Sequence, residues 1–249
     1  VLPAGSAAFL DVSVQLSRSY TYRVVAFGEG GESSPSNEAS ARTPEPLLPP
    51  PPPLVPAVPS LPPGGLDSDS DGLTDIEEVL YGTDVHTPDA DNDGFLDGNE
   101  TFHLYNPAAK SPVRLLDSGL VKLFAAPVGW SLLVPANWTT GLDVPDGSQA
   151  TIATGRGETI SLHIEDNPTA VSLGDWYMAR APGESASSVR AFVTRGGLQG
   201  IAVSDRLEAL FVWGGKVFRV KYQTDGQPFI NYRTTFEMML NSLKLVGVP

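Results

Sequence analysis

The chain contains no cysteine, which excludes disulfide bonds and thiol chemistry. It has no run approaching the ~18 apolar residues that a membrane-spanning helix requires, so we expect no membrane span. Lys and Arg number 16 against 29 Asp and Glu and form no cluster, so nucleic acid is not an expected partner. The motifs GxSxG and HExxH and a phosphate-binding glycine loop are also absent, and we expect no enzyme activity.

What the chain has instead is a concentrated negative charge. Residues 66–112 hold twelve of the acids and one base, whereas residues 113–249 hold equal numbers of both. Two twelve-residue stretches lie in this region, DSDSDGLTDIEE at 67–78 and DADNDGFLDGNE at 89–100. Both place carboxylates at positions 1, 3, 5, 9 and 12 and glycine at position 6. A solvated acidic run has no reason to keep such a register, so the repeat indicates a specific site.

This spacing lets one short loop wrap a hard divalent cation in oxygen, and it predicts two bound Ca²⁺ ions. Mg²⁺ fits less well, because it resists losing its waters and demands a tighter octahedron. The expected ligands are carboxylates, with a backbone carbonyl at position 7 and position 9 acting directly or through water: Asp67, Asp69, Asp71, Leu73, Asp75 and Glu78, then Asp89, Asp91, Asp93, Phe95, Asp97 and Glu100. Asp84 and Asn106 are further candidates, with ordinary turn residues as the alternative.

The loops differ from EF-hands, because PPGG at 62–65 and VHTP at 85–88 prevent a helix from entering either of them. The DxDxDGxxDxxE units with an intervening GTD resemble bacterial thrombospondin type 3 repeats over residues 67–100. The resemblance implies calcium-loop repeats with little regular structure. One short helical turn is expected after each loop, at 76–81 and at 101–105.

The acidic segment has little apolar material, so it should stay unfolded without the ions. Metal binding and folding are then one event. We expect a calcium-dependent brace that sets the geometry between its neighbours. Asp69→Ala together with Asp91→Ala should abolish binding and leave the C-terminal domain folded.

Residues 1–43 are expected to be β-rich, because YTYRVVA at 20–26 alternates strictly before a Gly/Glu/Ser turn. With Asp11, Val14 and Tyr20, this segment resembles the end of a fibronectin type III domain, in which the corner tyrosine binds upstream backbone. Such a fragment cannot bury a core alone. Residues 44–65 hold eleven prolines and predict a semi-rigid polyproline spacer, with a swivel at Gly64-Gly65. An SH3-type ligand is the alternative.

Residues 113–249 predict one α/β domain. The expected strands are 130–134, 149–154, 159–165, 190–194, 198–204, 207–213 and 216–223, and the expected helices are 172–180 and 232–243. The last helix should bury Phe236, Met239, Leu240 and Leu243 on one face. Core packing is also expected for the tryptophans, which are Trp130, Trp138, Trp176 and Trp213.

The motifs GWSLLVPANW at 129–138, SLGDWYMAR at 172–180 and FEMMLNSLKL at 236–245 resemble PsbP-like domains over residues 120–246. The resemblance implies an α/β/α sandwich about an antiparallel sheet, acting mainly by binding other macromolecules. Glu158, Glu165 and Asp166 are weighed as paired acids for glycoside hydrolysis, against a solvated strand end. His163 is expected to face solvent.

These observations predict a multidomain chain with four parts at 1–43, 44–65, 66–112 and 113–249: a partial β-sandwich, a proline-rich linker, calcium-loop repeats, and an α/β (α+β) sandwich with a mainly antiparallel sheet. Because the chain begins at Val1, we expect a piece of a longer secreted precursor. The expected function is a calcium-braced, non-catalytic scaffold of a secreted or cell-surface bacterial protein. Its C-terminal domain would bind an extracellular protein or glycan in adhesion. The alternative is the accessory tail of an extracellular hydrolase.

Overall fold

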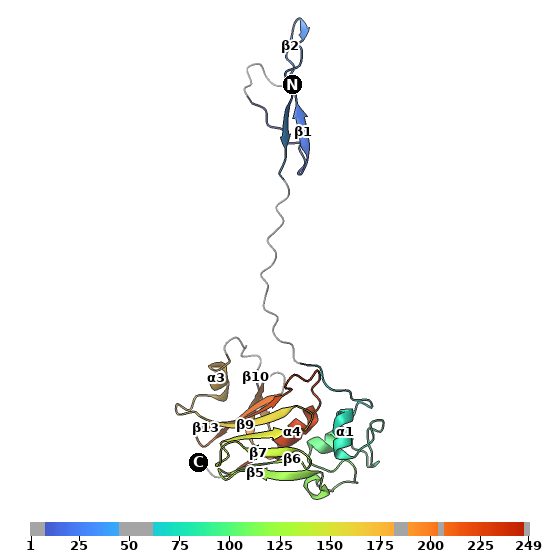
Figure 1. Ribbon diagram of the computed structural model, residues 1–249, viewed down its shortest axis with the longest axis vertical. Coiled ribbons are helices and arrows are strands. Elements are labelled where there is room, and N and C mark those ends of the chain that lie inside the picture. Colours follow the sequence, from blue (N-terminus) through green and yellow to red (C-terminus); the bar gives the residue numbers. More distant parts are fainter. Residues whose placement is uncertain (1–7, 45–61, 182–188, 204–206, 247–249) are drawn as a thin grey trace. The chain divides into compact units, whose positions relative to one another are not determined.

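The computed structural model describes residues 8–44, 62–181, 189–203 and 207–246. The chain divides into two compact units, Val1–Val58 and Pro59–Pro249 (Figure 1). Most of the expected polyproline spacer, residues 45–61, lies outside the described residues.

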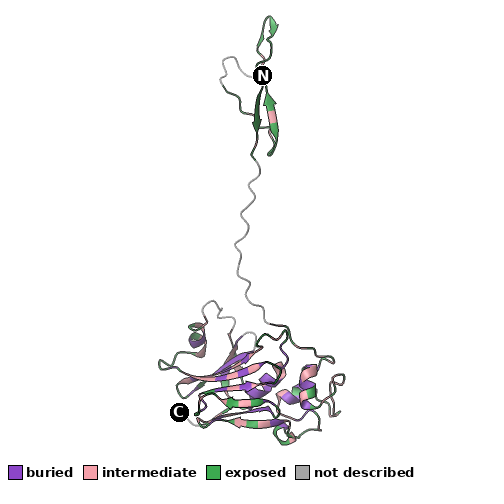
Figure 2. Cartoon of the chain, viewed as in Figure 1, coloured by how far each residue is buried: buried purple, intermediate pink, exposed green. Residues whose placement is uncertain are grey.

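In the first unit, residues 8–44 form two small antiparallel ladders. Its strands are β1 (Ser19–Tyr22), β2 (Phe27–Gly28), β3 (Gly31–Glu32) and β4 (Ala39–Arg42), paired β1 with β4 and β2 with β3. The Tyr20 hydroxyl accepts a 2.7 Å hydrogen bond from the backbone N–H of Gln15, the upstream contact expected of a corner tyrosine. Among residues 8–44 none is buried, in agreement with a fragment that has no core of its own (Figure 2). The fibronectin resemblance itself stays a prediction.

The second unit is built on antiparallel sheets. Its described strands are β5 (Val121–Ala125), β6 (Trp130–Pro135), β7 (Thr139–Leu142), β8 (Gln149–Ala153), β9 (Thr159–Asp166), β10 (Val189–Val193), β11 (Gln199–Val203), β12 (Glu208–Trp213), β13 (Lys216–Gln223) and β14 (Lys244–Leu245). Seven form a sheet in the order β10-β11-β12-β13-β9-β8-β7, and three form a sheet in the order β14-β6-β5. The mainly antiparallel α+β sandwich expected from the sequence is therefore confirmed at the level of fold class.

Few helices accompany these sheets among the described residues. They are α1 (Asp75–Tyr81), α2 (Asp97–Phe102), the 3₁₀ helix η1 (Leu115–Ser118), α3 (Leu173–Met178) and α4 (Arg233–Ser242). Helix α3 begins as predicted, with the Ser172 hydroxyl accepting a hydrogen bond from the Asp175 N–H. Helix α2 begins four residues earlier than the turn expected at 101–105, because it starts inside the second acidic loop.

The core of the second unit lies between the sheets and α4. Trp130, Trp138, Trp176 and Trp213 are all buried, as predicted. Helix α4 buries Phe236 and Met239 completely, and the Leu133 N–H of β6 donates to its Ser242 hydroxyl at 2.8 Å. Leu73 and Tyr81 belong to the same hydrophobic cluster as Phe236. The expected boundary at 112/113 therefore does not separate two cores.

The entry of the chain into this unit also differs from expectation. The Gly65 N–H donates to the Ile230 carbonyl at 2.8 Å, and the Ile230 N–H donates to the Pro63 carbonyl at 2.8 Å. These reciprocal bonds fix the backbone on both sides of Gly64. The swivel predicted at Gly64-Gly65 is therefore not found.

Candidate metal centre

The two acidic loops have the same backbone conformation. Positions 4 and 6 lie in the left-handed region in both: Ser70 (φ 65°) and Gly72 (φ 102°) in the first loop, Asn92 (φ 59°) and Gly94 (φ 98°) in the second. Glycine adopts this conformation without steric cost, which explains its place at position 6. The repeated bends turn the carboxylates at positions 1, 3 and 5 toward a common point.

Each loop accordingly gathers its first three aspartates. Asp67, Asp69 and Asp71 each offer a carboxylate oxygen within 4.8 Å of the others, and the triplet at residues 89, 91 and 93 does the same. Backbone amides hold these side chains in place. Asp67 Oδ1 accepts from the Ser70 N–H at 2.7 Å, and Asp89 Oδ2 accepts from the Gly94 N–H at 2.9 Å. Two acidic clusters that could hold a metal ion are thus present.

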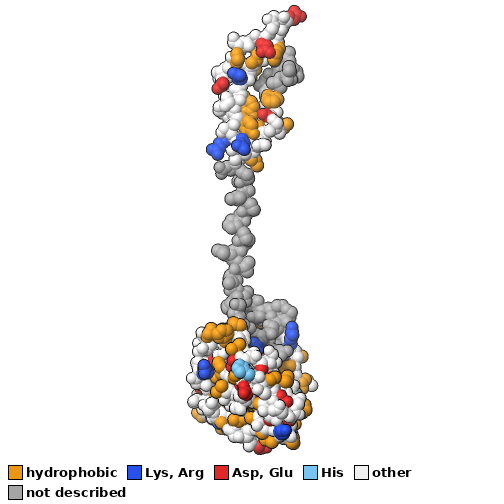
Figure 3. Space-filling model, turned by 90° about the vertical axis from the view of Figure 1, so that its right-hand side faces the viewer, with side chains coloured by type: hydrophobic (Ala, Val, Ile, Leu, Met, Phe, Trp, Pro, Cys, Tyr) orange, Lys and Arg blue, Asp and Glu red, His pale blue; other side chains and the backbone are white. Residues whose placement is uncertain are grey.

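The glutamate at position 12 completes the acid set of each loop. Glu78 is fully buried and Glu100 is 3% exposed. Neither carboxylate has a hydrogen-bond partner on either oxygen, and both oxygens of Asp91 and Oδ2 of Asp69 are also buried without one. On the face turned toward the viewer in Figure 3, carboxylates are scattered among polar and apolar atoms and form no large patch.

Burial and mutual repulsion disfavour the ionised forms of these two glutamates when no cation is present. Burial, followed by the charges of Asp69 and Asp71, raises the pKa of Glu78 to about 7. Burial, followed by Asp93 and Asp91, raises the pKa of Glu100 to about 8. A divalent cation would favour the charged forms and offset both effects.

The aspartates at position 9 behave differently from the expected ligands. Asp75 Oδ1 accepts from the Ser68 N–H at 2.9 Å, and its Oδ2 accepts from the Ser68 hydroxyl at 3.0 Å. Asp97 Oδ1 accepts from the Ala90 N–H at 3.0 Å, but its Oδ2 is buried without a partner. Asp75 therefore acts first as a brace of its own loop, whereas Asp97 keeps an oxygen for another partner.

The remaining candidate ligands, at position 7 and outside the loops, differ in exposure and hydrogen bonding. At position 7, Leu73 has a fully buried side chain, whereas the Phe95 side chain is 56% exposed. Asp84 is exposed and accepts from the His86 N–H at 3.1 Å, and Asn106 accepts from the Ala108 N–H at 3.2 Å. These bonds are typical of turn residues, and neither side chain is part of an acidic triplet.

The contact of the first loop with α4 was not foreseen from the sequence. Glu77 is fully buried; its Oε1 accepts from the Thr235 N–H at 2.6 Å, and its Oε2 from the Thr74 N–H at 3.0 Å. The Thr74 hydroxyl donates to the Asn231 carbonyl at 2.6 Å, and the Tyr81 hydroxyl and Thr235 Oγ1 lie 3.1 Å apart. The sequence carried one signal for Glu77, the T-x-x-E capping box at 74–77.

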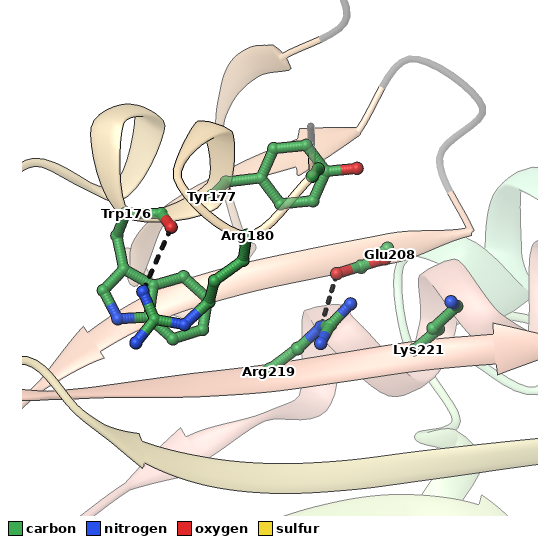
Figure 4. Close-up of a pocket in the computed structure, with 7 residues that line it drawn as sticks. Trp176, Tyr177, Arg180, Glu208, Arg219 and Lys221 are labelled. Atoms are coloured by element: carbon green, nitrogen blue, oxygen red, sulfur yellow. Dashed lines mark hydrogen bonds and ion pairs between the residues drawn. The ribbon is translucent and has the colours of Figure 1, made fainter. Parts of the chain in front are cut away.

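A second polar feature is a cavity between the α3 segment and strands β12 and β13 of the large sheet. This cavity of about 270 Å³ is lined by Trp176, Tyr177, Arg180, Ala181, Glu208, Arg219 and Lys221. In Figure 4 the Arg180 guanidinium covers the Trp176 ring, at 3.8 Å from its centroid, and Arg219 pairs with Glu208. The described lining contains no Ser, Cys or His, and the arginines already have partners within it.

The acids weighed for glycoside hydrolysis do not meet. Glu158 precedes the eight-residue strand β9 and Glu165 lies near its other end. Glu158 is fully buried and accepts from the Tyr222 hydroxyl at 2.6 Å, whereas Glu165 pairs with Arg180 at 3.6 Å and Asp166 with Lys216 at 3.3 Å. His163 is half-buried on β9 between inward-facing neighbours.

Comparison with known proteins finds weak similarity to solved structures. No protein-family model matches the chain, and no curated protein matches it significantly. The solution structure of cyanobacterial PsbP (CyanoP) from Synechocystis sp. PCC 6803 is similar, with a TM-score of 0.34 and 14% identity, covering 51% of this chain and 94% of that chain. This is a weak structural neighbour, and it does not bear on the thrombospondin or fibronectin resemblances. Among the described residues, no helix has the length and apolar character needed to cross a membrane.

Proposed function

We propose that this chain is a calcium-binding, non-catalytic part of a secreted or cell-surface bacterial protein. Each acidic loop holds one Ca²⁺. The two ions stabilise the flank of the C-terminal body, which in turn contacts an extracellular protein or glycan.

The buried glutamates at position 12 carry the proposal. A buried carboxylate oxygen without a donor costs free energy unless a cation accompanies it. Glu78 and Glu100 each have two such oxygens, and each is electrostatically coupled to the aspartates of its own loop. An acidic surface without a metal would leave its carboxylates in water instead.

The donor set favours calcium among the common divalent ions. Each loop supplies several carboxylate oxygens from a flexible, glycine-bent backbone, and Ca²⁺ accepts about six to eight oxygens in variable geometry. Extracellular modules of this kind bind at roughly 10⁻⁴–10⁻³ M. An affinity in this range, measured for this chain, would suit calcium levels outside cells and support the proposed location.

The contacts with α4 give the ions a structural role. Thr74, Glu77 and Tyr81 follow the first ligand triplet directly and hydrogen-bond to residues at the start of α4. Removing the ions leaves repelling carboxylates beside these contacts, so the loss of calcium should loosen this flank.

Calorimetric titration of the full chain with CaCl₂ tests the proposal, and we expect two ions per chain. Glu78→Gln and Glu100→Gln should each weaken one site by about tenfold or more, because the number of charged ligands tunes affinity. Asp84→Asn is the matched control: it removes an exposed acid from the same segment and should leave both sites unchanged. The absence of calcium binding in the parent chain would contradict the proposal.

The alternative function, an accessory tail of an extracellular hydrolase, keeps the same calcium sites. It differs in what the whole protein contains: a catalytic domain encoded upstream of Val1 would favour it. Binding of the chain alone to an extracellular glycan or protein would favour the adhesion role.

A further inference from the structure

The two acidic loops touch each other. Asp71, in the first loop, accepts a 2.9 Å hydrogen bond through Oδ2 from the N–H of Gly98, in the first turn of α2. The approach is close, since a Cβ at Gly98 would lie 2.6 Å from the Asp71 carbonyl oxygen and 2.9 Å from the carbonyl carbon of Gly72. The start of α2, which belongs to the second loop, therefore lies directly against the ligand triplet of the first.

The position-9 aspartates, Asp75 and Asp97, make the same backbone hydrogen bond through Oδ1 and differ in the partner of Oδ2. In both, Oδ1 accepts a hydrogen bond from the backbone N–H at position 2 of the same loop. Position 2 is Ser68 in the first loop, and its hydroxyl occupies Oδ2 of Asp75. Position 2 of the second loop is Ala90, whose side chain has no hydrogen-bond donor. Oδ2 of the fully buried Asp97 accordingly has no partner.

Asp97 directly precedes Gly98, which contacts Asp71, and charges of both loops act on its carboxylate. Among the charged groups acting on Asp97, Asp71 of the first loop is the strongest, ahead of Asp89 of its own loop, and Asp69 also contributes. Asp97 is likewise among the charges that act on Glu78. Asp97 thus lies near the carboxylates of the first loop as well as those of the second.

Resting on the proposed function that both loops bind Ca²⁺, we infer that Asp97 gives its Oδ2 to the ion held by Asp69, Asp71 and Glu78. The first site is then incomplete without the second loop. An ion in the second loop fixes the start of α2 and so places Asp97 for the first ion. The two sites should bind with positive coupling, for which about 5–150-fold is typical.

Calorimetric titration of the full chain with CaCl₂ tests this assignment. Both loops stay intact in this test, and Glu78→Gln identifies the first site in the two-site titration of the parent chain. Asp97→Asn should then weaken the first site by about tenfold, because one charged ligand is lost. Asp75→Asn is the matched control at the same loop position, and it should have a smaller effect because both Asp75 oxygens are already bonded to Ser68.

A second variant avoids the loss of a carboxylate. Ala90→Ser supplies the hydroxyl that Ser68 supplies to Asp75, and it should compete for Asp97 Oδ2 and weaken the first site several-fold. Tryptophan fluorescence, which reports only on residues 113–249, checks that each variant is folded. If Asp97→Asn and Ala90→Ser leave the first site within twofold of its parent, the assignment is wrong although calcium binding stands. If the parent chain binds no calcium, the proposed function fails as well.

Discussion

The Oε1 atom of Glu77 and the backbone N–H of Thr235 form a 2.6 Å hydrogen bond between residues 158 positions apart. Glu77 stands beside Glu78, a proposed calcium ligand, in the sequence, and Thr235 lies in the first turn of α4. This bond joins the acidic repeats to the last helix of the β-rich body. The repeats are therefore part of the folded unit, and their stability and that of the body should change together.

Replacing Glu77 should weaken this junction. Glu77→Ala leaves the N–H groups of Thr235 and Thr74 without their acceptors, and each buried unpaired donor costs about 1–3 kcal/mol. We expect a loss of about 2–5 kcal/mol in the free energy of unfolding, measured by urea denaturation in saturating calcium. Val79→Ala, on the exposed side of the same helix, should change it by less than about 0.5 kcal/mol. Equal effects of the two variants would show that the junction contributes nothing specific.

Removal of calcium should destabilise the body as well as the loops. All four tryptophans lie in residues 113–249, so their fluorescence follows the body alone. Because Leu73 and Tyr81 share its core, we expect chelation, or Asp69→Ala with Asp91→Ala, to lower the midpoint of thermal unfolding reported by tryptophan. The sequence alone predicted that the C-terminal domain stays folded in the double variant, and the shared core adds that it should melt at a lower temperature. An unchanged midpoint would restore the separate-domain view.

The metal-free chain should lose stability as the pH rises. Folding raises the pKa of Glu78 from 4.5 to about 7 and that of Glu100 from 4.5 to about 8. Between the unfolded pKa and these folded values, the folded chain binds more protons than the unfolded chain. The free energy of unfolding should therefore fall from about pH 5 to about pH 8. Calcium replaces the protons and should remove this fall. Urea denaturation across this range, with and without calcium, measures both trends, and a metal-free chain that gains stability toward pH 8 would contradict the expectation.

A methyl group at Gly98 should separate the two loops. Gly98→Ala places a Cβ against backbone atoms of the first loop, and we expect a loss of about 1–3 kcal/mol in the free energy of unfolding together with weaker calcium binding. Gly174→Ala is the control in another helix: its Cβ would meet nothing closer than 3.9 Å, so it should be neutral or stabilising by up to about 1 kcal/mol. Denaturation and calorimetry of the two variants provide the comparison.

Local patterns in the sequence predicted much of the body. Strand β13 runs from Lys216 to Gln223 as expected, because its alternation is regular and Gly214-Gly215 marks the turn before it. The face of α4 was also identified correctly, since Phe236, Met239, Leu240 and Leu243 are all buried. Strands β5, β7 and β14 were not predicted. Strand β14 has two residues and pairs with the distant β6, whereas β5 and β7 pair with the next strands along the chain, β6 and β8.

The acid triplets followed from loop spacing alone, because their geometry is local. The different roles of Asp75 and Asp97 did not, because they depend on residue 68 or 90 and on a contact between loops. The burial of Glu77 depends on a helix more than 150 residues away. Long-range contacts of this kind leave little trace in the sequence of a single chain.

The pairing of Pro63 and Gly65 with Ile230 has a mechanical consequence. These two backbone hydrogen bonds lie immediately before the first acidic loop. The carbonyl of Asn231, the residue after Ile230, also accepts a hydrogen bond from the Thr74 hydroxyl. A pulling force that arrives along the chain ahead of Pro62 therefore meets these two backbone hydrogen bonds before it reaches the first acidic loop. Part of the load then passes to the segment that leads into α4.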